Sequence, residues 1–386
     1  MKVTPNQALG GHRSMPHPTR RAVAFVGLVA GGALALSACG SDNSSTSAPP
    51  AGGGSSSSSS STSYCATGNI SGGGSTFQQN IELQWIKDYQ AKCSGSTIAY
   101  AGTGSGAGKT SFGNGTVDFA GSDSNMNDTE QAAANARCGA SNYAVQTPIT
   151  AGAAVLVYNL PSVKNLQLSA QTIAGIFGGT ITKWDDAAIK ADNPNTTLPS
   201  TTIVPVHRSD KSGTTNIFSS FLKANAGSAW TLGAGETLTW PGGQSGNGST
   251  GTTAAVKQAQ GGITYTELSF AKLDNLPFAK VKNASGAYVE ANGQSVSAGL
   301  ADATVDTTHK DVRAVVNYGT TNKDAYPLSA VTYVITCNAG NKSAALLKGF
   351  FTYALTDGTG VDDQLGYAPL PSSLLSAAKS QVGSLS

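Results

Sequence analysis

Charged residues are scarce in this chain, and neither sign dominates. They make up 12% of the 386 residues, with 24 Lys and Arg against 22 Asp and Glu. The first 38 positions hold four basic residues and no acidic one, so the rest of the chain has 20 basic and 22 acidic residues, a net charge of −2. Proteins that bind nucleic acid need a basic face or stripe. Nucleic acid is therefore excluded as a partner, and a bound anion must be held by local dipoles and hydrogen bonds.

Groups that activate a nucleophile or hold a metal are equally scarce. Only His207 and His309 of the four histidines lie beyond the first 38 residues, and no stretch matches the Gly-x-Ser-x-Gly pattern of a hydrolase. An exported phosphatase would need such a nucleophile or a metal cluster. We therefore expect no enzymatic activity, no metal and no cofactor.

Residues 1–38 have the order of a secretory signal peptide, with basic residues followed by an apolar, small-residue-rich run over 22–38. The run ends in Leu36-Ser37-Ala38-Cys39, which resembles the bacterial lipobox, where the signal is cut before the cysteine and the cysteine is acylated. A transmembrane anchor is the alternative, although 17 apolar residues are short for a span. Arg20-Arg21 leaves the choice between general and twin-arginine export open.

Residues 39–64 predict a flexible tether. Their composition is dominated by Ser, Gly, Ala, Pro and Thr, which cannot bury enough apolar surface to fold. About 24 such residues have a root-mean-square end-to-end distance of roughly 27 Å. The remaining residues, 65–386, are enough for two lobes.

Four cysteines remain once Cys39 is set aside: Cys65, Cys93, Cys138 and Cys337. An even number in an exported protein predicts two disulfides. Three pairings are possible, and we favour Cys65–Cys93 with Cys138–Cys337, because the first would brace the start of a strand against the end of the helix that follows. Metal binding by the four is the alternative, but no Cys-x-x-Cys spacing occurs.

Two glycine-rich turns each lead into a predicted helix. Strands at 69–72 and 97–101 flank a helix at 78–92 in a βαβ unit, and Ser75 and Thr76 lie near the start of that helix. The second turn, residues 102–110, fails the phosphate-loop pattern because Thr103 stands where its first glycine is required. We interpret Ser105 there as a donor at another helix N-terminus.

Residues 207–215, HRSDKSGTT, predict an anion-binding helix N-terminus. Arg208 supplies a forked cation, and hydroxyl and backbone N–H groups of the first turn donate to an oxyanion. An N-cap with a surface arginine is the alternative. Residues 117–123 predict a strand ending in Asp123, which taken alone could be a solvated loop acid or a helix cap.

The order of these segments resembles the phosphate-binding receptors of bacterial high-affinity phosphate ABC transporters, which are type II periplasmic binding proteins. The resemblance covers the whole folded part, and the lipobox and tether resemble actinobacterial lipoprotein members. It rests on the motifs GGGSTF (72–77), GTGSGAG (102–108), VDFAGSD (117–123), IFGGTITKWDDAAI (176–189), HRSDKSGTT (207–215) and GYAPLP (366–371). It implies an α/β fold of two Rossmann-like lobes, joined by a two-strand hinge, with the ligand between them. We place lobe I at 65–158 plus 330–386 and lobe II at 159–329.

Matched residue by residue, the resemblance implies a phosphate site with members in both lobes. These are Thr76, Phe77, Ser105 and the acceptor Asp123 on one side, and Arg208, Ser212, Gly213 and Thr214 on the other. We also expect Asp210, two residues from Arg208, to pair with and orient the guanidinium, with a plain surface ion pair as the alternative. Some family members carry alanine at the position of Ser75 and an acid at that of Thr215, so we leave open whether these two add donors.

The resemblance also explains Asp123. Phosphate keeps at least one proton near neutral pH, so its O–H group can donate a hydrogen bond to a carboxylate, whereas sulfate has no proton to offer. The unpaired contact would cost sulfate about 2–5 kcal/mol, and about 4 kcal/mol is roughly a thousandfold preference.

We therefore expect a lipid-anchored receptor on the extracytoplasmic face that hands inorganic phosphate to an ABC permease, with energy supplied by a separate ATPase. The alternatives are a receptor for another oxyanion, such as sulfate or molybdate, and a surface adhesin that binds no anion.

Overall fold

The computed structural model describes residues 63–306 and 308–386. The expected signal peptide, Cys39 and nearly all of the tether therefore lie outside the described residues. The described residues belong to one compact unit, called the head below. Within the described ranges, no helix combines the length and hydropathy needed to cross a membrane.

The head consists of two groups of elements. The first group comprises β1 (Gly68–Gly74), α1 (Gln79–Lys92), β2 (Ser96–Gly102), α2 (Ser105–Gly113), β3 (Phe119–Ser122), α3 (Asp128–Cys138), β4 (Ala144–Tyr158), β13 (Ser329–Cys337), α10 (Ala344–Ala354), η2 (Asp357–Val361), α11 (Asp362–Leu365), β14 (Tyr367–Ala368) and α12 (Ser372–Gly383). The second comprises β5 (Gln167–Leu168), α4 (Ala170–Phe177), α5 (Ala187–Asp192), β6 (Val204–Arg208), α6 (Gly213–Asn225), η1 (Gly227–Ala229), β7 (Gln244–Gly246), α7 (Gly248–Gln258), β8 (Gly262–Glu267), α8 (Leu268–Leu273), β9 (Lys280–Lys282), β10 (Tyr288–Val289) and α9 (Gly293–Gly299). The short strands β11 (Thr304–Asp306) and β12 (Arg313–Val315) follow and are described separately below.

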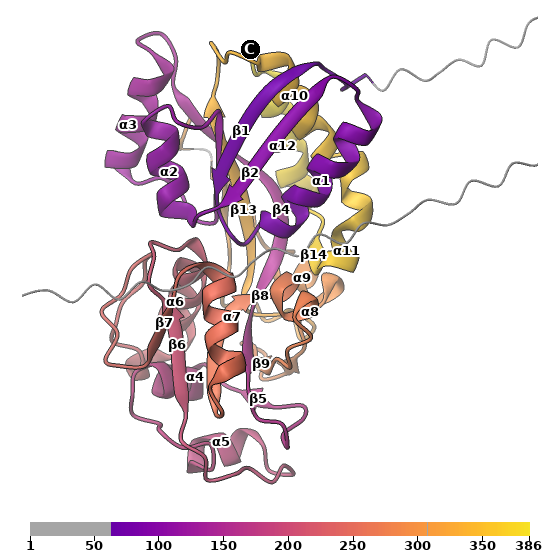
Figure 1. Ribbon diagram of the computed structural model, residues 1–386. Coiled ribbons are helices and arrows are strands. Elements are labelled where there is room, and N and C mark those ends of the chain that lie inside the picture. The colour runs from indigo at the N-terminus through magenta and orange to yellow at the C-terminus, as the bar shows by residue number, and fades with distance from the viewer. Residues whose placement is uncertain (1–62, 307) are drawn as a thin grey trace, which may run out of the picture. The chain divides into compact units, whose positions relative to one another are not determined.

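One mixed sheet runs through both groups in the order β2-β1-β3-β13-β4-β8-β6-β7, with β14 beside β4 (Figure 1). The expected βαβ unit is confirmed, since β1 and β2 are parallel and joined by α1. The buried face of α1 includes Ile81, Trp85, Ile86 and Tyr89. Parallel strands end at the same edge of a sheet, so the loops after β1, β2 and β3 lie together.

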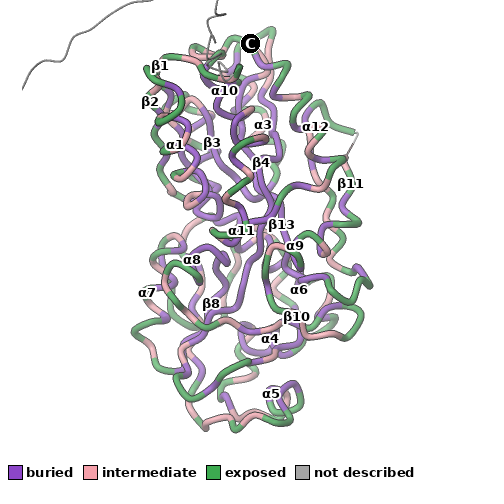
Figure 2. The backbone as a smooth tube through the Cα atoms, turned by 90° about the vertical axis from the view of Figure 1, so that its right-hand side faces the viewer, coloured by how far each residue is buried: buried purple, intermediate pink, exposed green. Residues whose placement is uncertain are grey.

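Strand β4 continues from one lobe into the other. It pairs with β13 as far as Ala153 and with β8 from Ala154 onward. Every residue of β4 and β13 is buried, and Figure 2 shows both strands in the purple of the core. The strand partner changes five residues before the lobe boundary that we expected at 158.

The hairpin of β11 and β12 lies against the first lobe. It contacts α12 and β4, and the N–H of Val312 donates to the carbonyl of Gln146 at 3.2 Å. Our expected boundaries assign this hairpin to lobe II. We therefore propose that the chain returns to lobe I before residue 304, while the other boundaries stay as expected.

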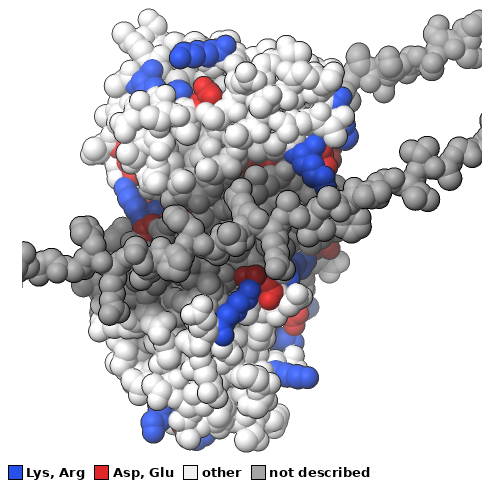
Figure 3. Space-filling model, in the orientation of Figure 1, with Lys and Arg blue, Asp and Glu red and all other residues white. Residues whose placement is uncertain are grey.

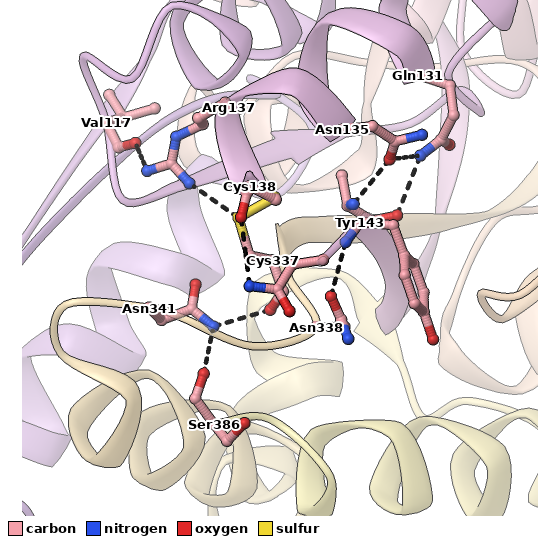
Figure 4. Close-up of a disulfide and its surroundings, with 12 residues drawn as sticks. Val117, Gln131, Asn135, Arg137, Cys138, Tyr143, Cys337, Asn338, Asn341 and Ser386 are labelled. Carbon is pink, nitrogen blue, oxygen red and sulfur yellow. Dashed lines mark hydrogen bonds between the residues drawn. A yellow bond between two sulfur atoms is a disulfide. The ribbon is translucent and has the colours of Figure 1, made fainter. Parts of the chain in front are cut away.

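The disulfides pair Cys65 with Cys93 and Cys138 with Cys337, which confirms the favoured connectivity. The first joins the segment before β1 to the end of α1. The second joins the last residue of α3 to the last residue of β13 (Figure 4). Arg137 lies beside it, with Nη1 3.3 Å from the Sγ of Cys337.

Removing the second disulfide is expected to destabilise the head more than removing the first. Cys138–Cys337 spans 199 residues and Cys65–Cys93 spans 28. The loop-closure entropy restored to the unfolded chain is larger for the longer loop, by about 1–2 kcal/mol. Urea unfolding of the C138S/C337S and C65S/C93S double variants measures both losses. Equal losses would contradict the entropic explanation.

Candidate functional site

Asp123, directly after β3, is the central acceptor of the first lobe. It is 5% exposed. Its Oδ1 accepts hydrogen bonds from the hydroxyls of Ser75 and Thr332, the latter at 2.8 Å, and its Oδ2 accepts one from the hydroxyl of Ser105 at 3.2 Å. These donors come from the β1–α1 loop, from β13 and from the first turn of α2. The site therefore requires three separate segments to converge.

Burial raises the pKa of Asp123 to about 6. The three hydroxyl donors lower it, and the negative charge of Glu267 raises it further. At pH 7 the carboxylate is thus mostly ionised and available as an acceptor, whereas at pH 5 it is mostly protonated.

Arg208, the last residue of β6, is the cation of the second lobe. Asp210 holds it at two points, through Nε at 2.7 Å and Nη2 at 2.6 Å. Although burial disfavours the charge, the bonds to Asp210 raise the pKa of Arg208. The pairing that we expected is present, and it leaves Nη1 to face other partners.

The Nη1 of Arg208 lies among three hydroxyl groups. It is 3.1 Å from the Oγ1 of Thr76, 3.2 Å from the Oγ of Ser249 and 3.4 Å from the Oγ1 of Thr214. Thr76 belongs to the first lobe and the other residues to the second. The guanidinium therefore contacts both lobes.

Helix α6 begins beside Arg208, as expected. Ser212 is its N-cap, and its side chain accepts from the N–H of Thr215 at 3.2 Å. Helix geometry provides no intrahelical acceptor for the N–H groups of the first turn, among them those of Gly213 and Thr214. These N–H groups and the helix dipole favour an anion at this end.

The roles of Ser75 and Thr215 were left open above. In the structure, the hydroxyl groups of both residues form hydrogen bonds with other residues of the protein. Ser75 donates to Asp123 and accepts from the N–H of Gln78 at 3.2 Å. The hydroxyl of Thr215 lies 2.8 Å from that of Tyr265. Phe77 is buried, and its carbonyl accepts from the hydroxyl of Tyr367 at 2.6 Å.

The two halves of the site are in close contact in this structure. A Cβ added to Gly213 would lie 2.5 Å from the Oγ of Ser105 and 2.6 Å from the Oδ2 of Asp123. Only glycine fits at this distance. The structure is thus a closed arrangement, and all eight of the expected ligand residues lie on the segments that meet there.

Two buried residues at the site were not predicted. Ser249, in the first turn of α7, lies 2.7 Å from the hydroxyl of Thr76. Glu267, the last residue of β8, accepts from the hydroxyl of Thr214 at 2.6 Å. Sequence signals for both residues existed. Residues 246–251 are a third glycine-rich segment, which includes the first turn of α7, and Glu267 ends a buried strand much as Asp123 follows one.

The charge of the visible surface is consistent with recognition by local groups. The face shown in Figure 3 carries few charged side chains, and basic and acidic ones are scattered over it. Among the side chains visible on this face, no basic stripe is seen.

Two α/β lobes with anion donors that meet between them define the class of solute-binding proteins. A family model described as a PBP superfamily domain matches residues 57–358. Phosphate-binding protein PstS3 of Mycobacterium bovis is 36% identical over 368 residues, which cover 94% of this chain and 98% of that relative. Phosphate-binding protein PstS of Xylella fastidiosa is 34% identical over 313 residues, 79% and 82% of the two chains. The chain therefore belongs to the PstS family of phosphate-binding proteins within the PBP superfamily.

Solved structures have the same fold. A phosphate-binding protein from Stenotrophomonas maltophilia superposes with a TM-score of 0.62 at 20% identity, over 81% of this chain and 93% of the other. A high-affinity periplasmic phosphate-binding protein called PfluDING, solved with bound phosphate, superposes with a TM-score of 0.65 at 23% identity. The match again covers 81% of this chain and 93% of the other. The expected fold class is confirmed. The curated relatives are named for binding and not for a reaction.

Replacing Gly213 with alanine is expected to prevent full closure. The added methyl group would collide with Ser105 and Asp123, so anion affinity should fall at least tenfold while the melting temperature stays near that of the wild type. Gly242→Ala is the matched control, because nothing lies within 4 Å of a Cβ there. Calorimetric titration and thermal unfolding of both variants test this. Unchanged affinity of Gly213→Ala would show that the closed contact is not needed.

Proposed function

We propose that this protein is an extracytoplasmic receptor that binds inorganic phosphate between its lobes and delivers it to an ABC permease for import. The observation that carries the proposal is that a buried acceptor, Asp123, and a buried cation, Arg208, lie on segments of the two lobes that meet at their junction. A site for an anion without protons has no use for a buried carboxylate.

The donors match a tetrahedral oxyanion. We assign eight residues to the ligand: Thr76, Phe77, Ser105, Asp123, Arg208, Ser212, Gly213 and Thr214. Arg208 supplies charge through Nη1, and the starts of α2 and α6 supply N–H groups and dipoles. Asp123 accepts a hydrogen bond from the O–H group that phosphate retains.

Three further residues position the eight binding residues but do not themselves contact the anion in this proposal. They are Ser75, Asp210 and Thr215. Asp210 fixes the plane of the guanidinium, Ser75 donates to Asp123, and Thr215 contacts Tyr265. Their hydrogen bonds orient the ligand groups before the anion binds, which reduces the entropy cost of binding.

Binding and closure are coupled in this proposal. Donors from both lobes reach the anion only when the lobes meet, so phosphate shifts the equilibrium toward the closed form. The permease would recognise that form, and a separate ATPase would supply energy.

We further propose that Cys39 is the acylated N-terminus and that the tether holds the head near the membrane. The support is the lipobox-like sequence before Cys39 and the composition of residues 41–63. Loss of radiolabelled palmitate incorporation in a Cys39→Ser variant would test the anchor.

Titration of the anion-free head with phosphate and with sulfate near pH 7 tests the proposal. We expect tight phosphate binding and sulfate binding at least a hundredfold weaker. Preference for sulfate or molybdate would indicate another oxyanion receptor. Absence of any anion binding would overturn the assignment and favour an adhesin.

Discrimination between phosphate and sulfate is expected to fall as the pH is lowered from 7.5 to 5. Asp123, with a pKa of about 6, gains a proton over this interval and then donates to either anion. In the Asp123→Asn variant, the affinities for phosphate and sulfate should differ by no more than about tenfold at both pH values. Asp128→Asn, an exposed site with the same change of charge, is the control. A constant preference in the wild type would contradict the role of Asp123.

A further inference from the structure

A group of charged residues joins the two lobes outside the anion site. Lys109 of the first lobe lies 3.0 Å from Glu130 of the same lobe and 2.9 Å from Glu236 of the second. Lys211 of the second lobe lies 2.5 Å from Glu130 and 3.4 Å from Glu236. Ser124 donates to Glu236 at 2.6 Å. We name these five residues the interlobe ion cluster.

The cluster is electrically balanced and, apart from the side chain of Lys211, which is 44% exposed, largely buried. Two lysines face two glutamates, and the side chain of Lys109 is only 1% exposed. A buried ammonium group requires paired acceptors, because an unpaired charge in the interior is costly. Separation of the lobes would break the bonds from Lys109 and Ser124 to Glu236 and the bond from Lys211 to Glu130. These contacts therefore exist only in the closed form.

The cluster is built onto the two helices that face the anion. Lys109 lies one turn after Ser105 in α2, and Lys211 precedes Ser212, the N-cap of α6. The N–H of Gly106 donates to the carbonyl of Lys211 at 3.0 Å. A Cβ on Gly106 would lie 2.5–2.6 Å from the side-chain carbons of Lys211. The helix N-termini are thus held together by a backbone bond and by ion pairs beside it.

We propose that Lys109 and Glu236 are positioning residues for phosphate binding, which hold the starts of α2 and α6 together and so set the stability of the closed form. The proposal rests on the proposed function. Neither residue is among the assigned ligands. Each residue affects phosphate binding by increasing the fraction of protein in the closed form. Loss of either residue therefore accelerates the dissociation of phosphate.

A double-mutant cycle on the head tests this, with Lys109→Met, Glu236→Gln and the combined variant. Each single change should weaken phosphate binding about 10- to 100-fold, mainly through faster dissociation, and the combined loss should be clearly smaller than the product of the two. The preference for phosphate over sulfate should stay within about twofold of wild type, because the ligand contacts are intact.

Glu290→Gln is the matched control. It removes the same charge from a pair, Lys280–Glu290 at 3.5 Å, that lies within the second lobe and is largely exposed. It should leave the affinity and the dissociation rate unchanged. The proposal would be overturned if the loss of phosphate affinity in the combined variant equalled the product of the two single losses. It would also be overturned if the single variants bound phosphate with wild-type affinity.

A second measurement does not depend on the ligand. Spin labels at Ala133→Cys and Ala191→Cys, both exposed, report the distance between α3 and α5. In the absence of phosphate, Glu236→Gln should populate longer distances than the labelled parent. Identical distributions would overturn the proposal. If the parent binds no phosphate, the proposed function fails while this comparison still decides whether the cluster favours closure.

Discussion

The buried carboxylate of Asp123 is the constraint around which the site is organised. A charge that is 5% exposed must receive hydrogen bonds, and its donors, Ser75, Ser105 and Thr332, come from three different segments. This requirement places the β1–α1 loop and the start of α2 against β13. The same arrangement directs the N-termini of α1 and α2 toward Arg208 in the other lobe.

Close approach of the lobes is the second constraint, and glycine makes it possible. Gly213 lies against Ser105 and Asp123, and Gly106 lies against Lys211. Both contacts would be blocked by a single methyl group. The anion site and the interlobe ion cluster thus depend on the same short distance between α2 and α6, so affinity for the ligand and stability of the closed form are linked by geometry.

Much of the fold could be predicted because its signals are local. The apolar spacing of Ile81, Trp85 and Tyr89 identified α1, and the capping residues before residue 213 identified α6. The lobe boundaries were harder to predict from the sequence. Strand β4 is buried along its whole length and shows no signal at Ala153, where its partner changes from β13 to β8. A strand buried on both faces has no alternation that marks such a change.

The sequence by itself predicted an export signal and determined the starts of α1 and α6, because each of these depends on neighbours within a few positions. It also indicated four cysteines for two disulfides, although three pairings were possible. Only the tertiary structure decided which groups meet. Ser249 and Glu267 joined the site through contacts with Thr76 and Thr214, which lie 173 and 53 residues away. The partners of Lys109 likewise became known only in the folded head, since long-range pairing follows from packing and not from local pattern.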